Sequence, residues 1–176
     1  MCDGAEGFDP EPIATIFRLD PDGSLHRMIE GVSIPNGISW SKDDKLMYFT
    51  DSPTKNIFVA DFDAEKGTLS NKRVFFHLEE KEEEAVPDGH CQDVEGYFWV
   101  AIHGGSKVVR VSPEGKKVAE VHFPARGTSC PGIAGEDLYV TSGLEPESKK
   151  FGGSLFKFHI GVKGAPLNRF KWDQGI

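Results

Sequence analysis

Two short motifs about fifty residues apart carry the side chains best suited to chemistry, Pro35-Asn36-Gly37 and Pro87-Asp88-Gly89. An Asn carbonyl oxygen and an Asp carboxylate are hard ligands of the kind that Ca²⁺, Mg²⁺ and Mn²⁺ prefer, and Zn²⁺ also accepts them. Asn-Gly and Asp-Gly are also common turn pairs whose side chains bond their own backbone, so a turn role is the alternative. We take Asn36 and Asp88 as candidate metal ligands.

Each motif opens a block of short β-like segments, and the block repeats. The segments after the two motifs, and those of a looser third copy, are 46–51 and 56–62, 97–101 and 107–111, and 137–141 and 154–158. A repeat of roughly 40–50 residues with several short strands in each copy is typical of a β-propeller. Because the two motifs begin equivalent strands, we expect Asn36 and Asp88 to face the central channel together.

The repeats predict where the propeller blades begin and end. Residues 14–19 and 24–29 flank a turn signal and form half a blade, and four-strand blades follow over about 37–78 and about 89–123. Residues 128–160 supply about three more strands. The fold class is therefore all-β, a partial propeller of about three and a half blades in one domain over 1–176, with a polar segment at 1–12 and a tail at 165–176.

An open ring has consequences for the core and the edges. Propellers close with about four to eight blades, so a shorter arc leaves sheet faces and strand edges uncovered. We expect a fragment of a larger propeller that self-associates through its open ends; the alternative is that two chains complete one ring. Alternation along the strands predicts that seven apolar side chains pack between blades: Trp40, Phe49, Phe58, Phe98, Val100, Val109 and Val111.

Composition excludes several classes of partner. The chain has 176 residues, 38% of them hydrophobic, which suits one globular domain, and a formal charge of -8. That charge disfavours nucleic acid and anionic membranes as partners. No apolar run is long enough to span a bilayer, and the first residues lack the basic and apolar regions of a signal peptide, so the expected location is cytoplasmic.

The remaining polar candidates have structural interpretations as well. Three cysteines without a CxxC pair argue against a disulfide framework, and we expect Cys91 and Cys130 to be small, buried strand residues. His90 and His103 fit core or rim positions, with substrate contact as the alternative. The acidic run over 79–84 is interpreted as a solvated loop, with a calcium-collecting tract as the alternative.

Asp51 and Ser52 end a predicted inner strand and are candidates to reach the channel, whereas Asp61 and Asp93 suit turn or inter-strand hydrogen bonds. The sequence contains no G-x-S-x-G, P-loop, G-x-G-x-x-G or H-E-x-x-H motif. A Ser-His-Asp triad stays open, although nothing marks one Ser as a nucleophile.

These motifs resemble those of the gluconolactonase, regucalcin (senescence marker protein) and luciferin-regenerating enzyme family. The resemblance is carried by 34–41 with 46–52, by 87–101, by Thr128-Ser129-Cys130, and by 153–156 with Gly161-Val162-Lys163-Gly164. It covers nearly the whole chain. It implies a six-bladed propeller with one divalent cation in the channel, and hydrolysis of sugar or other lactones.

By this resemblance the family's metal ligands in Pro-Asn-Gly and Pro-Asp-Gly correspond to Asn36 and Asp88, and the acid–base role falls to Asp88. The family's N-terminal Glu ligand and its Arg and Asn substrate contacts have no counterpart here, as if the first two blades were absent. We therefore expect a metal-dependent lactonase with impaired activity and one bound cation, with Ca²⁺ favoured and Zn²⁺, Mg²⁺ and Mn²⁺ as alternatives.

The expected partner is a small-molecule lactone. Two other hypotheses stay open: a non-catalytic propeller fragment that binds a cation or a partner, and an incomplete gene model without independent function.

Overall fold

The computed structural model describes residues 11–79, 84–144 and 150–170 of the chain. Ten residues of the predicted N-terminal segment, including Cys2, most of the acidic run and the end of the predicted tail lie outside these residues. Apart from the single 3-10 turn η1 (Ser52–Thr54), the described part is built from β-strands and their connections. None of its helices is long and apolar enough to cross a membrane.

The described residues form thirteen strands in four antiparallel sheets. The sheets, in chain order, contain β1 (Ala14–Leu19) and β2 (Leu25–Val32); β3 (Pro35–Trp40), β4 (Leu46–Asp51), β5 (Asn56–Asp63) and β6 (Thr68–His77); β7 (Val86–Gln92), β8 (Phe98–His103), β9 (Lys107–Val111) and β10 (Lys117–His122); and β11 (Thr128–Ala134), β12 (Asp137–Ser142) and β13 (Leu155–His159). Each sheet is a simple up-and-down meander.

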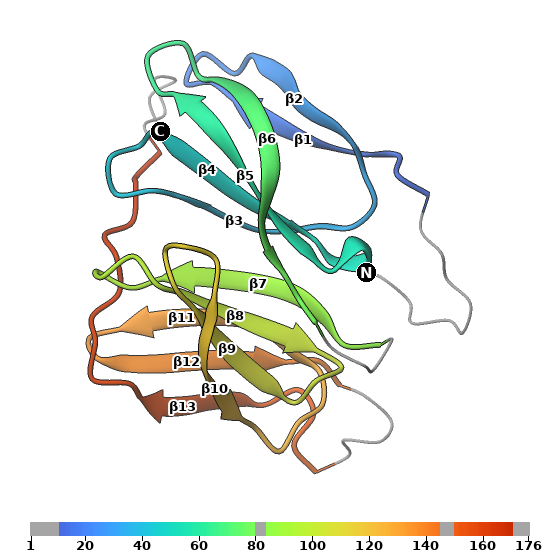
Figure 1. Cartoon of the computed structure of the whole chain (residues 1–176), viewed down its shortest axis with the longest axis vertical. Helices are drawn as coiled ribbons and strands as arrows, with labels where there is room; N and C mark the ends of the chain where they lie inside the picture. The colour runs from blue at the N-terminus through green and yellow to red at the C-terminus, as the bar shows by residue number, and fades with distance from the viewer. Residues whose placement is uncertain (1–10, 80–83, 145–149, 171–176) are drawn as a thin grey trace.

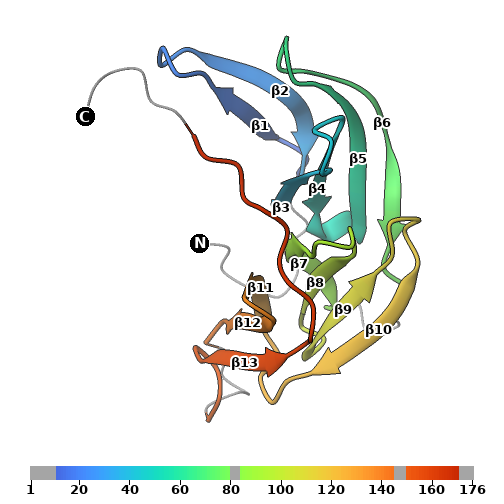
Figure 2. The ribbon, with the colours of Figure 1, turned by 90° about the vertical axis from the view of Figure 1, so that its left-hand side faces the viewer.

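The four sheets are arranged as an arc, which confirms the predicted all-β partial propeller (Figure 1). Figure 2 shows β3, β7 and β11 on the concave side, toward the channel, while β6 and β10 lie on the convex side. The strands of the three later sheets begin and end within three residues of the predicted blade limits.

Three apolar cores lie between successive sheets, because side chains alternate along each strand and point to both faces of a sheet. Met47 and Phe49 pack with Ile29 and Val32 against the first sheet, whereas Tyr48 packs on the next sheet. The seven predicted core residues all belong to these clusters, with Trp40 and Phe58 half-buried: Trp40, Phe49 and Phe58 lie in the first core and Phe98, Val100, Val109 and Val111 in the second.

The segment after β13 runs back across the concave side of the arc (Figure 2). Gly164 forms an isolated bridge with Asp93, and Ala165 N donates to the Gln92 carbonyl oxygen at 2.9 Å. Farther along, Asn168 Nδ2 donates to Asp44 Oδ1 at 3.3 Å. These contacts lie at the ends of β7 and β3 that are farther from Asp88 and Asn36.

Candidate functional site

The first strand of each of the three later sheets contains an irregularity at the same place. The pairing shifts between Asn36 and Ile38 in β3, between Pro87 and His90 in β7, and between Thr128 and Pro131 in β11. A bulge of this kind inserts an extra residue and re-aims the local side chains. The three bulges define a repeated position on the concave side of the arc.

Strand pairing makes the equivalence of positions explicit. Ile38 pairs with Phe49, His90 with Val100, and Pro131 with Val140. Counting back two residues from the first member of each pair gives Asn36, Asp88 and Ser129. The equivalence of Asn36 and Asp88 was predicted from the sequence. Ser129 had no predicted role, although the Thr128-Ser129-Cys130 motif was the available signal.

Glycines let the inner strands of neighbouring blades approach closely. A Cβ atom added at Gly37 would overlap the His90 ring and lie 3.0 Å from the Asp88 carbonyl oxygen. A Cβ added at Gly89 would lie 2.9 Å from the Ser129 carbonyl oxygen. Glycine is therefore required in both motifs for packing, and the Pro-Asn-Gly and Pro-Asp-Gly segments lie side by side. That one cation touches both side chains stays a prediction.

The half-buried Asn36 side chain has a defined partner. Its Nδ2 donates a hydrogen bond to Ser52 Oγ at 3.1 Å, and Ser52 is itself buried at the end of β4. An amide whose nitrogen is held in this way offers its carbonyl oxygen as the remaining acceptor. Of the predicted Asp51–Ser52 pair, Ser52 thus contacts a candidate ligand, whereas Asp51 accepts from the backbone N–H groups of Ser33 and Ile34.

Burial raises the pKa of the half-buried Asp88 carboxyl above its ordinary value, and the positive charge of His103 and the Gly89 N–H oppose that shift. Removing a carboxylate from water disfavours its charged form, which makes the group a stronger base. The Asp88 charge also contributes to a raised pKa of Cys130, after the larger effect of burial, so Cys130 lies in the same electrostatic environment.

The two histidines have different surroundings. His90 is buried, its Nε2 lies 2.8 Å from Ser39 Oγ and its Nδ1 lies 3.4 Å from Thr50 Oγ1. Burial lowers the pKa of His90 to about 4, so the ring is neutral near pH 7. These contacts assign His90 to the packing between blades. His103 ends β8, in the electrostatic environment of Asp88.

The two aspartates expected to act structurally do so. Asp93 accepts hydrogen bonds from the Trp99 indole, the Arg110 guanidinium and the backbone N–H groups of Glu95 and Tyr97. Asp61 accepts from Asn71 and Arg73. Both side chains therefore stabilise turns and strand pairs.

One expectation about the cysteines was wrong. Cys91 and Cys130 are both free thiols, and Cys91 is half-buried against the core between the last two sheets. Cys130 is exposed instead of buried. It is equivalent to Gly37 and Gly89, which face the following blade, and it lies on the last sheet of the described residues.

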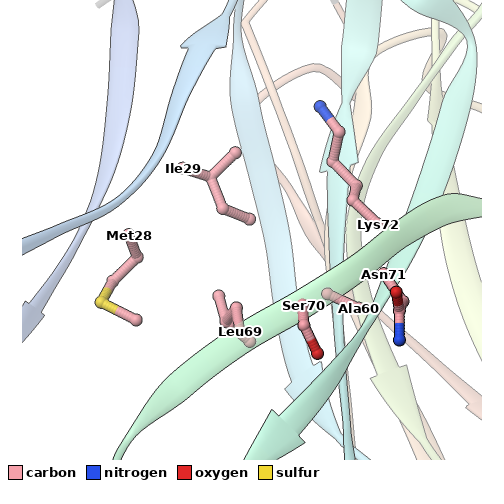
Figure 3. Close-up of a pocket in the computed structure, with 7 residues that line it drawn as sticks. All are labelled: Met28, Ile29, Ala60, Leu69, Ser70, Asn71 and Lys72. Atoms are coloured by element: carbon pink, nitrogen blue, oxygen red, sulfur yellow. The ribbon is translucent and has the colours of Figure 1, made fainter.

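A pocket of about 250 Å³ lies between β2, β5 and β6, and Figure 3 shows the side chains that line it. Its lining residues are Met28, Ile29, Ala60, Leu69, Ser70, Asn71 and Lys72. The lining has no carboxylate and contains neither candidate ligand. The candidate site is therefore the channel side of β3 and β7 and not this pocket.

The described residues contain no cluster of three or more His, Cys, Asp or Glu side chains that is able to hold a metal ion. The candidate donors of this part of the chain are thus one carboxylate, from Asp88, and one amide oxygen, from Asn36. Hard cations take six to eight oxygen ligands, so two side chains account for part of a coordination shell.

Comparisons with known proteins identify the family of the chain. The family described as SMP-30/Gluconolactonase/LRE-like region matches residues 2–143. Regucalcin from Oryctolagus cuniculus is 37% identical over 163 residues, covering 86% of this chain and 54% of the relative. The chain therefore spans about half the length of the curated relatives that it matches.

Solved structures give the same result. A calcium-binding protein, regucalcin, from Agrobacterium tumefaciens superposes with a TM-score of 0.77 at 28% identity, over 89% of this chain and 56% of that one. A luciferin-regenerating enzyme superposes with a TM-score of 0.74 at 31% identity, over 86% of this chain and 53% of the other.

Proposed function

The chain belongs to the SMP-30/gluconolactonase/LRE-like family, and from that premise we propose that it serves metal-dependent hydrolysis of a small lactone on the channel side of β3 and β7. One observation carries the proposal: equivalent bulges in two adjacent inner strands bring the Asn36 and Asp88 segments side by side. A glucono-lactone is the natural first substrate to test, because relatives of this fold include proteins described as gluconolactonases.

The chemistry of the donors fits a hard cation. The amide nitrogen of Asn36 donates a hydrogen bond to Ser52 Oγ, which leaves Oδ1 of Asn36 as the group that can bind a cation. Burial partly desolvates the Asp88 carboxyl and raises its pKa, whereas a bound positive charge would favour the ionised form. These two groups are those that would hold the ion, together with ligands from outside the described residues, and Ca²⁺ suits them best.

A lactone is a cyclic ester, so its hydrolysis requires an activated water molecule and stabilisation of a tetrahedral oxyanion. A bound divalent ion polarises the carbonyl group and increases the acidity of nearby water. Asp88 would accept a proton from the attacking water and return it to the leaving alkoxide, because it is the titratable carboxylate of this site. Asn36 does not titrate in this range and therefore binds and orients without moving a proton.

A second candidate function is cation binding without catalysis. It is favoured by the observation that the described residues supply two candidate donors and no acidic or histidine cluster. A propeller with that donor set is suited to bind a cation weakly or to present its channel side to a partner.

Self-association is part of the proposal as well. Apolar side chains on the first and last sheets are exposed, including Leu25 at 62% and Leu155 at 65%. Uncovered apolar patches of a few hundred Å² commonly mediate association. Sedimentation of the chain at increasing concentration tests this expectation, and a monomer at all concentrations contradicts it.

The functional test separates binding from turnover. Calcium titration calorimetry of the chain is compared with the Asp88→Ala, Asn36→Ala and Asp61→Ala variants, the last as a surface carboxylate control. We expect Asp88→Ala and Asn36→Ala to weaken binding and Asp61→Ala to leave it unchanged.

Glucono-δ-lactone hydrolysis is then followed in a pH-stat with and without Ca²⁺. Calcium-dependent turnover that Asp88→Ala abolishes supports the lactonase. Calcium binding without turnover supports the second candidate instead, and identical behaviour of Asp88→Ala and the unmodified chain overturns the site.

A further inference from the structure

Ser52 occupies a position that recurs at the channel side of successive blades. It lies three residues after Phe49, and His103 lies three residues after Val100, the residues that pair with Ile38 and His90. The same counting from Val140 leads to Gly143. Two of the three blades therefore have a polar side chain at this position, in each case beside the polar residue of the bulge.

The environment of Ser52 holds its hydroxyl in place. The residue is 4% exposed, and it begins η1 immediately after the buried end of β4. Its backbone N–H donates to the Ile34 carbonyl oxygen at 3.2 Å, and its carbonyl oxygen accepts from Lys55 N at 3.0 Å. Its side chain therefore has little freedom to move away from Asn36.

We propose that Ser52 is a positioning residue: its Oγ accepts a hydrogen bond from the Asn36 amide nitrogen and thereby turns the amide oxygen toward the cation position. The inference rests on the proposed function, since it concerns the same site. An amide group has two ends of nearly equal shape, of which one donates and one accepts. Without a partner for Nδ2, the amide is free to rotate and to present its N–H groups to the cation.

His103 supports this assignment by analogy of position. It stands beside Asp88 as Ser52 stands beside Asn36, and its electrostatic effect is the larger of the two that oppose the raised pKa of the Asp88 carboxyl. A carboxylate has two identical oxygens and needs no partner to choose between them. The same repeat position thus carries a hydroxyl beside the amide and an imidazole beside the carboxylate.

The test is a titration of Ca²⁺ into the full chain and its variants, because binding is measured without turnover. Ser52→Ala should weaken the affinity by about 10- to 100-fold, the range typical of lost partners of metal ligands. Ser112→Ala is the matched control: Ser112 is 5% exposed, and its Oγ accepts from Glu114 N at 3.3 Å in a turn of another blade. It should leave the affinity unchanged.

A second background separates positioning from a general loss of structure. In Asn36→Asp, both ligand ends are oxygens, so Ser52→Ala should then change the affinity by less than about threefold. An equal loss in both backgrounds would mean that Ser52 merely supports the fold, and the proposal would be wrong. An unchanged affinity in Ser52→Ala also overturns it.

Failure of the proposed function is visible separately. If the unmodified chain binds no Ca²⁺, the cation site is wrong, and the side-chain amide protons of Asn36 in NMR spectra then decide the positioning role alone. A slowly exchanging Asn36 Nδ2 proton that Ser52→Ala makes fast supports the orientation by Ser52. The same exchange rate in both proteins rejects it.

Discussion

The inner strands of the arc meet at two interfaces that have the same backbone geometry and different side-chain chemistry. At both, a glycine of the bulge motif allows close approach, Gly37 at β3–β7 and Gly89 at β7–β11. The side chains two residues later, at equivalent positions, are Ser39 and Cys91. The first is polar and the second packs in an apolar cluster.

The β3–β7 interface is a hydrogen-bond network. His90 contacts Ser39 Oγ and Thr50 Oγ1, while Gln92 Nε2 donates to Ser39 Oγ at 2.7 Å and to the Trp40 carbonyl oxygen at 3.1 Å. Such bonds are directional, and a shift of one strand along the other leaves buried donors without partners. This interface joins the two strands that carry Asn36 and Asp88.

The β7–β11 interface has apolar groups at the equivalent places. Ile133 corresponds to Gln92, and it packs with Cys91 and Ala101 in the core between the last two sheets. Apolar packing resists separation of the strands but tolerates small sliding better than a network of hydrogen bonds does. We infer that polar contacts are concentrated at the interface that holds the geometry of the candidate site.

The largest expected difference between the interfaces appears on acidification. The pKa of His90 is lowered to about 4 in the folded protein, while an unfolded chain has the ordinary value near 6.5. The unfolded state therefore gains a proton first, and stability that is complete above about pH 6.5 falls as the pH drops toward 4, by about 3 kcal/mol.

Urea unfolding at a series of pH values measures this loss. His90→Gln keeps a hydrogen-bonding group but does not titrate, so its stability should fall less over this range. The exposed His159 provides the control, and His159→Gln should behave as the unmodified chain does. Equal acid sensitivity of His90→Gln and the unmodified chain would show that the β3–β7 network is not the acid-labile part.

Adding a methyl group at either glycine tests the close approach of the strands. We expect Gly37→Ala and Gly89→Ala each to cost about 1–3 kcal/mol of unfolding free energy, because the interior has no space for the new atom. At Gly37 one obstacle is the His90 ring, whereas at Gly89 the obstacles include backbone atoms of Ser129 and Cys130.

The two glycine variants should therefore differ in whether they can be rescued. His90→Ala removes one obstacle and should recover part of the Gly37→Ala loss in a double-mutant cycle. It should recover nothing of the Gly89→Ala loss. Additive effects in both cycles would contradict the packing that distinguishes the two interfaces.

Single-atom deletions at the equivalent positions sharpen the comparison further. Ser39→Ala removes the partner of the buried His90 Nε2 and one of the two acceptors of Gln92 Nε2, so we expect a loss of about 1–3 kcal/mol. Cys91→Ala deletes one sulfur from an apolar contact and should cost about 1 kcal/mol. Thermal or urea unfolding measures both, and a larger loss for Cys91→Ala would reverse the assignment of the polar interface.

The repeat period and the alternation of apolar residues were enough to predict the strands, the blade limits and the core residues, because both depend on local sequence. The equivalence of Asn36 and Asp88 followed from the same period. The contacts of Ser52 and His90 depend on strand register and on the neighbouring blade, which a single sequence does not specify. The exposure of Cys130 was missed because a strand pattern does not tell whether another sheet covers it.

Thiol reactivity is the smallest predicted effect, and it reports on both interfaces. Burial raises the pKa of Cys91 to about 12, so its reactive thiolate is scarce near pH 8. The pKa of Cys130 is raised by burial and then by the Asp88 charge, but its side chain is exposed. In a Cys2→Ser background, iodoacetamide should therefore modify Cys130 before Cys91.

Asp88→Asn should accelerate modification of Cys130 and leave the rate at Cys91 unchanged, because the carboxylate that contributes to the raised pKa of Cys91 is Asp93. Peptide mass spectrometry at short reaction times measures the two rates. Faster modification of Cys91, or a Cys130 rate that ignores Asp88→Asn, would contradict the proposed arrangement of the inner strands.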